Sequence, residues 1–267
     1  MSSGRVPIDK VSSDSPERDY VQSLSRGLTV LQAFNAERPA MTLADMSRAT
    51  GLTRATVRRL LLTLVSLGYV STDGRTFELT PRVLDLGFAF VSSLQLPVIA
   101  QPFMEALSDT VHESVSASVL DGTQIVYVAR VNTQRIMGIS LAIGSRLPAA
   151  WTSMGRVLLA GLDDDQLERF LDGLVIGEVT THSITDIDTL RSEVHAVRTQ
   201  GYALVDQELE EGIRSVAAPL RDRRGRTLAA INVGTHAARV TLKELRGVIL
   251  PALLETARSI DNQLAKR

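Results

Sequence analysis

Hydrophobic residues recur at helical spacing near the start of the chain. The spacing predicts an amphipathic helix that ends before Glu37, because four apolar side chains lie three or four residues apart: Leu24, Leu28, Leu31 and Phe34. Residues 1–19, which precede this helix, are rich in Ser, Asp and Pro. They predict a disordered leader.

Two further helices follow, separated by a glycine. Thr42 is the expected N-cap of a short helix, because Asp45 three residues later favours the first turn. Gly51 ends this helix in a tight turn, and Thr53 caps a third helix that extends to about Leu67. A short helix, a glycine turn and a longer helix form the helix-turn-helix arrangement.

The third predicted helix has an apolar side and an arginine-bearing side. At about 100° per residue, one side carries Val57, Leu60, Leu61, Leu64 and Leu67. The other side carries Ala55, Arg58, Arg59 and Ser66, flanked by Arg54 and Thr56, with Leu62 also outward. Residues near the start of such a helix contact base edges in the major groove, where Arg pairs with guanine. Because arginine faces are commonly just solvated, the assignment depends on the segments that follow.

The residues after the third helix have the pattern of a hairpin. Segments 69–72 and 76–79 are strand-like, and Asp73-Gly74 between them predicts a two-residue turn. A hairpin directly after a recognition helix is a wing, and Arg75 is placed there to contact a phosphate or the minor groove.

Thr80-Pro81 then begins a helix that is apolar around most of its surface. Such a helix needs a partner surface, and groove-reading helices normally work in pairs. We therefore expect this linker helix to pack against a second copy of the chain.

From residue 97 onward, helical and strand patterns are interleaved. A hairpin is expected around Asp121-Gly122, formed by residues 114–119 and 125–129. Further strands are predicted at about 137–142, 202–205, 213–220 and 227–233. Helices are predicted at 97–107, from Ser153, at 164–171, at 187–200 and at 242–264, the last bent at Pro251. Strands grouped with helices outside them predict an α+β sandwich.

Composition and charge support a division into two domains. The 267 residues are 44% hydrophobic, enough for two cores. We assign a DNA-binding domain to residues 20–80, a linker helix to 81–96 and a second domain to 97–267. Residues 20–94 hold 8 Arg and 5 acidic residues, whereas the chain from Gln95 holds 18 basic and 21 acidic residues. Between Asp45 and Asp73 there is no acidic residue, but there are four arginines: Arg48, Arg54, Arg58 and Arg59.

The sequence contains few of the motifs that are typical of catalytic or metal sites. It has no cysteine, and its histidines lack metal-ligand spacing: His112, His182, His195 and His236. No phosphate-binding loop or nucleophile elbow occurs, so we predict no catalytic residue, metal or cofactor. A cluster of carboxylates keeps open an enzyme acting on a small acid with an accessory DNA-binding domain, although such a run is typical of a solvated loop: Asp206, Glu208, Glu210 and Glu211. Without a signal peptide or membrane span, we expect a cytoplasmic protein.

Segment 23–28, the third helix and the wing resemble the IclR (isocitrate-lyase-regulator) family of bacterial transcription factors, and the resemblance extends over nearly the whole chain after the leader. It is carried by residues 67–87, 146–160, 205–220 and 231–240, and is closest to regulators of protocatechuate and β-ketoadipate catabolism. It implies a winged helix-turn-helix, a dimerising linker helix, a GAF-like α/β sandwich domain and commonly a dimer of dimers. The implied partners are operator DNA and a small organic-acid effector.

The resemblance also implies an effector pocket between the central sheet and the loop before the helix near Ser153. By position, its lining would include Trp151, Ser153, Met154, Asp206, Ile213, Ser215, Asn232 and Gly234. The N–H groups of residues 153–155 open a helix and favour an anion, and Trp151 would stack on an aromatic ring. Asp206 would accept a hydrogen bond from a ligand hydroxyl, or else cap its own loop. The expected DNA contacts are Thr42, Thr53, Arg54, Thr56, Arg58, Arg59 and Arg75.

Together these features predict a DNA-binding regulator of aromatic-acid catabolism that responds to an aromatic or dicarboxylic acid. They do not distinguish repression from activation or a dimer from a tetramer, and they name neither the effector nor the operator. Two alternatives stay open: the enzyme described above, and a DNA-binding architectural protein whose larger domain binds no ligand.

Overall fold

The computed structural model describes residues 20–35, 37–87, 96–133 and 141–266. These residues belong to two compact units, one within residues 1–90 and one within 91–267, and each unit is described by itself. The predicted leader and residues 88–95 of the predicted linker helix lie outside the described residues. Within the described residues, no helix is both long and apolar enough to cross a membrane.

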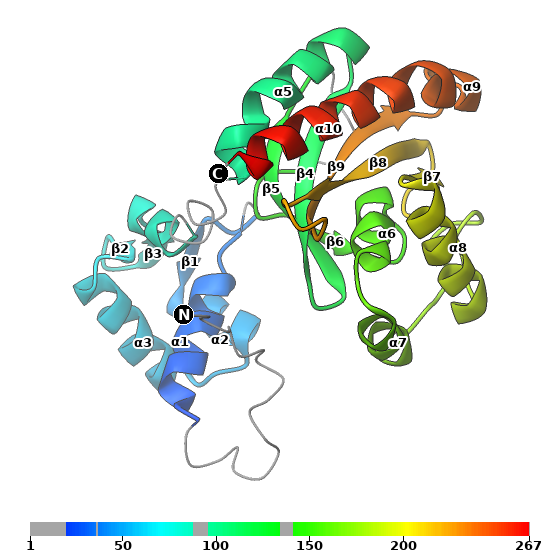
Figure 1. The fold of residues 1–267 in the computed structure, drawn as a ribbon. Helices are drawn as coiled ribbons and strands as arrows, with labels where there is room; N and C mark the ends of the chain where they lie inside the picture. The colour runs from blue at the N-terminus through cyan, green and yellow to red at the C-terminus, as the bar shows by residue number, and fades with distance from the viewer. Residues whose placement is uncertain (1–19, 36, 88–95, 134–140, 267) are drawn as a thin grey trace, which may run out of the picture. The chain divides into compact units, whose positions relative to one another are not determined.

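In the N-terminal unit, helices pack against a small antiparallel sheet (Figure 1). Its elements are α1 (Gln22–Gln32), β1 (Ala40–Thr42), α2 (Leu43–Thr50), α3 (Arg54–Ser66), β2 (Val70–Thr72) and β3 (Thr76–Leu79). The strand order is β1-β3-β2, and β1 was not predicted from the sequence. Apolar residues from all three helices and the sheet meet in one core, among them Val30, Met46, Val57, Leu61 and Phe77.

The predicted helix caps are confirmed. Thr42 and Asp45 form a reciprocal capping box at the start of α2, and Gly51 ends that helix with a left-handed φ of 70°. Thr53 caps α3 by accepting from the backbone N–H of Thr56 at 3.3 Å. These caps place the start of α3 on the surface, directly after the turn.

The predicted two-residue wing turn is wrong. Thr72 pairs with Phe77, so four residues connect the paired positions of β2 and β3. The Asp73 carboxylate accepts from the backbone N–H groups of Arg75 and Thr76 at 2.8 and 2.6 Å. This local side-chain turn stabilises a longer loop than the Asp-Gly pair indicates. A 3₁₀ turn at Pro81–Val83 follows the wing, and residues 84–87 are helical.

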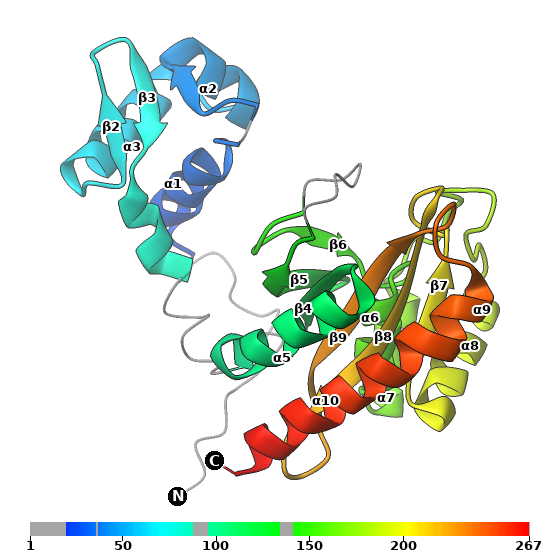
Figure 2. The same cartoon turned by 90° about the horizontal axis from the view of Figure 1, so that it is seen from above.

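The C-terminal unit has a six-stranded antiparallel sheet with helices on both faces (Figure 2). The strands, in the order β6-β5-β4-β9-β8-β7, are β4 (Ser114–Asp121), β5 (Gln124–Val131), β6 (Arg146–Pro148), β7 (Ala203–Asp206), β8 (Ile213–Arg221) and β9 (Thr227–His236). Helices α5 (Leu96–Val111) and α10 (Leu250–Ala265) cover one face. The other face is covered by α6 (Ser153–Ala160), α7 (Asp164–Asp172) and α8 (Ile187–Gln200). The predicted α+β architecture is confirmed.

Some predicted elements of this unit differ from the structure. Strand β6 was not predicted, and the strand expected near 137–142 falls largely on residues outside the described ones, while Leu141 and Ala142 are not in a strand. The final helix is interrupted by a π-helical turn at Leu245–Ile249, after α9 (Leu242–Glu244), and Pro251 lies in the first turn of α10, directly after that turn.

A buried ion pair joins α6 to the loop after β7. The Arg156 side chain is 2% exposed, and its guanidinium donates to the Glu208 carboxylate, whose side chain is 10% exposed. Arg156 Nε also donates to the carbonyl oxygen of Ala150 at 3.3 Å. Burial raises the pKa of Glu208, and the positive charge of Arg156 opposes that rise. Arg156 therefore connects two loops that border the same face of the sheet.

Gly155 allows α6 to start close to the loop before it. A Cβ atom at this position would lie 2.0 Å from the carbonyl oxygen of Ala149, which is backbone and cannot swing away. Gly247 is different, because a Cβ there would meet no atom within 4 Å.

We predict that Gly155→Ala destabilises the protein even though alanine favours helices. Overpacking against backbone costs about 1–3 kcal/mol, more than the roughly 0.5–1 kcal/mol that alanine gains over glycine in a helix. Urea unfolding measures this, with Gly247→Ala as the matched control that should equal or exceed the wild type. Equal stability of Gly155→Ala and the wild type would contradict the packing described here.

We also predict that Arg156→Ala and Glu208→Ala each lose about 3–5 kcal/mol of unfolding free energy, because each leaves one buried charge without its partner. The double variant Arg156→Met/Glu208→Leu removes both charges and should be more stable than either single variant. Urea unfolding of these variants checks this, and Arg156→Ala/Glu208→Ala closes a double-mutant cycle with the two single variants. Additive losses in the cycle would show that the pair does not interact.

Candidate functional site

The arginine-bearing side of α3 is on the surface of the N-terminal unit. Arg54, Arg58 and Arg59 are exposed, as is Thr53, and Thr56 is half-buried. Val57, Leu61 and Leu64 on the opposite side are buried in the core. The two faces of this helix are therefore arranged as the sequence predicts.

These cations are available for an external anion. Within the described part of the chain, Arg54, Arg58, Arg59 and the exposed Arg75 of the wing loop form no ion pair, and α3 contains no acidic residue. Thr42 differs from the other predicted DNA contacts. Its hydroxyl donates to Asp45 Oδ2 at 2.7 Å within the capping box, so it holds α2 in place.

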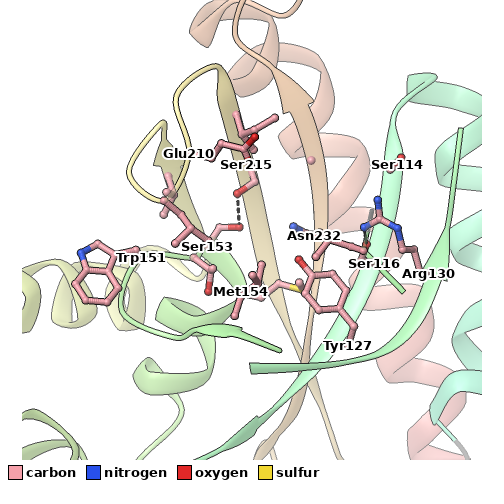
Figure 3. Close-up of a pocket in the computed structure, with 17 residues that line it drawn as sticks. Ser114, Ser116, Tyr127, Arg130, Trp151, Ser153, Met154, Glu210, Ser215 and Asn232 are labelled. Atoms are coloured by element: carbon pink, nitrogen blue, oxygen red, sulfur yellow. Dashed lines mark hydrogen bonds between the residues drawn. The ribbon is translucent and has the colours of Figure 1, made fainter. Parts of the chain in front are cut away.

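A cavity of about 90 Å³ lies in the C-terminal unit between the sheet and the start of α6 (Figure 3). Seven of the eight residues predicted for the pocket line it: Trp151, Ser153, Met154, Ile213, Ser215, Asn232 and Gly234. The structure thus brings together residues that are up to 83 positions apart in the chain, from Trp151 to Gly234.

The sheet forms the floor of the cavity through the register of its strands. Ser114 of β4 pairs with Gly234 of β9, which in turn pairs with Ser215 of β8. Two residues further along β4, Ser116 pairs with Asn232. Successive residues of a strand point to opposite faces, so these polar residues face α6, while Val115 and Ala117 belong to the core under α5 and α10.

Several polar groups at the α6 end already have protein partners. The hydroxyls of Ser153 and Ser215 are 2.8 Å apart (Figure 3). The Trp151 indole N–H donates to the carbonyl oxygen of Ile184 at 3.1 Å. The Gly155 N–H, expected to be open to an anion, donates to Thr152 Oγ1 at 3.1 Å. The N-terminus of α6 is therefore partly capped by the protein itself.

Arg130 and Tyr127 of β5 line the cavity and were missed from the sequence. Arg130 donates to Ser116 Oγ at 3.1 Å, and burial lowers the pKa of its guanidinium, which still lies far above neutrality for arginine. Burial raises the pKa of Tyr127 to about 12, so its hydroxyl stays protonated at neutral pH. Among the described lining residues, Arg130 supplies the positive charge.

Asp206 does not line the cavity. Its carboxylate is held by Arg214 on the neighbouring strand, with Nε–Oδ1 and Nη2–Oδ2 distances of 2.8 and 3.1 Å. Arg214 also donates to the Val240 carbonyl oxygen at 2.7 Å. Asp206 therefore serves the pairing of β7 with β8, on the face opposite to Val205, which does line the cavity.

The acidic cluster that suggested an enzyme does not form one site. Glu208 pairs with Arg156, Asp206 with Arg214, and Glu211 is exposed. Only Glu210 of the four lines the cavity in the described structure. Among the described residues, no group of three His, Asp or Glu side chains is placed to hold a metal ion.

Comparisons with known proteins agree with this architecture. The family described as the IclR helix-turn-helix domain matches residues 23–74, and the family described as bacterial transcriptional regulator IclR C-terminal matches residues 88–262. The Pca regulon regulatory protein of Pseudomonas putida is 43% identical to this chain, over 97% of this chain and 89% of its own length.

Solved structures include similar chains. A candidate transcriptional regulator from Rhodococcus sp. RHA1 has a TM-score of 0.84 and 54% identity, covering 92% of this chain and 99% of its own. The inducer-binding domain of the PobR transcription factor from Acinetobacter, a double mutant in complex with 3-hydroxybenzoic acid, has a TM-score of 0.60 and 33% identity, covering 62% of this chain and 98% of its own. This chain belongs to the IclR family of bacterial transcriptional regulators.

Proposed function

We propose that this protein is a DNA-binding transcriptional regulator whose C-terminal domain binds a small aromatic acid and controls genes of aromatic-acid catabolism. The ligand assignment rests on one observation: the half-buried guanidinium of Arg130 lines a small cavity whose other lining is largely apolar. The 3-hydroxybenzoic acid complex of the PobR relative and the name of the Pca regulon relative support the same class of ligand and pathway.

The DNA-binding part of the proposal depends on α3. Its exposed arginines, with the start of the helix capped by Thr53, favour insertion into the major groove, where Arg contacts guanine edges and phosphates. Arg75 in the wing loop would contact the backbone beside the groove. Thr42 would act through α2, because its hydroxyl is occupied by Asp45.

The acid is assigned to the Arg130 end of the cavity. The guanidinium would pair with the carboxylate, helped by the hydroxyls of Ser114 and Ser116. Tyr127, Leu147 and Met154 offer apolar surface to the ring. The volume of about 90 Å³ is smaller than the roughly 150 Å³ of a cavity that admits benzene, so the cavity would have to widen to bind one aromatic ring.

The response to the acid would be a change in the spacing of paired recognition helices. We assign dimerisation to the linker segment 81–96, with a dimer of dimers as the full assembly. An acid that binds one dimer geometry more tightly than another shifts the population toward it, and thereby changes the affinity for operator DNA. This role needs binding without turnover, so we propose no catalytic residue.

We predict that Arg58→Ala/Arg59→Ala binds the DNA upstream of its own gene at least about tenfold more weakly than the wild type. Each lost phosphate contact also reduces the slope of log K against log salt by about 0.9. Gel-shift titrations at several salt concentrations measure both quantities. Arg169→Ala/Arg258→Ala, which removes two exposed arginines of the C-terminal unit, is the matched control, and unchanged affinity of the α3 variant would reject the assignment.

We also predict that 4-hydroxybenzoate or protocatechuate raises the melting temperature of the wild type, because a ligand that binds only the folded state stabilises it. Arg130→Gln should abolish the shift, since it removes the cation that faces the carboxylate. A thermal-shift screen that also contains β-ketoadipate and short keto-acids checks this. Arg169→Ala should keep the full shift, and an Arg130→Gln variant that still responds would place the carboxylate elsewhere.

A further inference from the structure

The cavity has opposite charges at its two ends. Arg130 and Glu210 are the charged residues among the described side chains that line it. Figure 3 shows Arg130 beside Ser116, and Glu210 near Ser215, with Asn232 and Tyr127 between them. Ser116 and Ser215 lie on β4 and β8, which are separated by β9, and their partners on β9 are two residues apart, so the backbones of the two serines are about 12 Å apart. A single para-substituted ring with a hydrogen bond at each end spans about this distance.

Two acceptor atoms in this cavity have no protein donor. Within the described structure, Glu210 Oε2 and Asn232 Oδ1 are buried and accept no hydrogen bond. Both residues line the cavity. Buried acceptors are normally paired, and leaving one unpaired is costly. A ligand that carries hydrogen-bond donors would therefore satisfy these two acceptors.

Among the described residues, the donors at the start of α6 are already engaged by other partners. The Ser153 and Ser215 hydroxyls bond each other, and the Gly155 N–H is taken by Thr152. Arg156 of α6, which contacts the loop that carries Glu210, is engaged by Glu208 and the Ala150 carbonyl oxygen. A hydroxyl group on the ligand would satisfy Glu210 with a charge-assisted bond, whereas a second carboxylate would bring two acceptors of like charge together.

We propose that Glu210 determines specificity in this cavity, by selecting acids that carry one carboxylate and a distal hydroxyl and by rejecting dicarboxylic acids. This inference rests on the proposed function, because it takes the Arg130 end as the carboxylate site. It narrows the expected ligand from aromatic or dicarboxylic acids to hydroxylated aromatic monocarboxylic acids. Sites built to bond a hydroxyl discriminate strongly against analogues that lack it.

Three acids built on the same benzoate ring test this proposal on the full-length protein: 4-hydroxybenzoate, benzoate and terephthalate. They differ only in the group opposite the carboxylate. Calorimetric titration of the wild type should give dissociation constants at least about tenfold larger for benzoate and terephthalate than for 4-hydroxybenzoate, as expected when a polar site is left unpaired or repelled.

Glu210→Gln supplies the critical comparison, because glutamine keeps the size of the side chain but offers N–H donors. It should bind terephthalate at least about tenfold more tightly than the wild type does, and 4-hydroxybenzoate more weakly. Glu211→Gln, an exposed neighbour, is the matched control and should behave as the wild type.

The outcomes separate the two proposals. Equal wild-type affinities for terephthalate and 4-hydroxybenzoate, or an unchanged ratio in Glu210→Gln, would overturn the role of Glu210 while leaving an acid site that depends on Arg130. Binding of none of the acids by the wild type would overturn the proposed effector site, and the role of Glu210 with it.

Discussion

The cavity depends on how the first turn of α6 packs against the sheet. Thr152 caps that turn, Ser153 and Met154 face the cavity, Gly155 allows backbone contact with the preceding loop, and Arg156 holds the loop after β7 through Glu208. The first turn of α6 thus covers the cavity and also holds the loop after β7 beside it. Because the Arg156–Glu208 pair joins these two segments, a ligand that moves one of them would also act on the other.

In the N-terminal unit, the arginines of α3 are exposed and are not paired with acidic side chains of the described residues. Its caps are local, made by Thr42 and Thr53, so the arginines of α3 are not needed to stabilise the helix ends. The acidic residue nearest in sequence, Asp45, is occupied by its cap and by Arg48. The hydrogen bonds from Thr42 and Arg48 lower the pKa of Asp45, so its carboxylate stays ionised. Among the described residues the cations on α3 have no acidic partner, as the proposed contact with DNA phosphates requires.

Local patterns predicted the N-terminal unit well and the cavity only in part. Helical period and caps depend on neighbours three or four residues away, so α3 and its two faces could be predicted. Arg130 was missed because the expected hairpin strand ended at residue 129, and because a β-bulge between Ala117 and Ser118 shifts the register so that Arg130 pairs with Ser116. The alternating serines of β4 were a usable signal, since polar residues on one side of a buried strand indicate a lined cavity. The same alternation argues against Asp206, because Arg214 pairs with it on the far face.

The polar groups of the cavity also connect ligand binding with stability. If all donors and acceptors of the cavity were paired within the protein, the ligand-free protein would be more stable. Ligand binding would then form fewer new hydrogen bonds and would be weaker. In the described part of the chain, Glu210 and Asn232 retain unpaired buried oxygens, while Glu208, two residues from Glu210, is paired with Arg156. The loop after β7 therefore has one carboxylate that holds it to α6 and another that is open to the cavity. A ligand that donates to Glu210 would thus bind the same short loop that Glu208 fixes to α6.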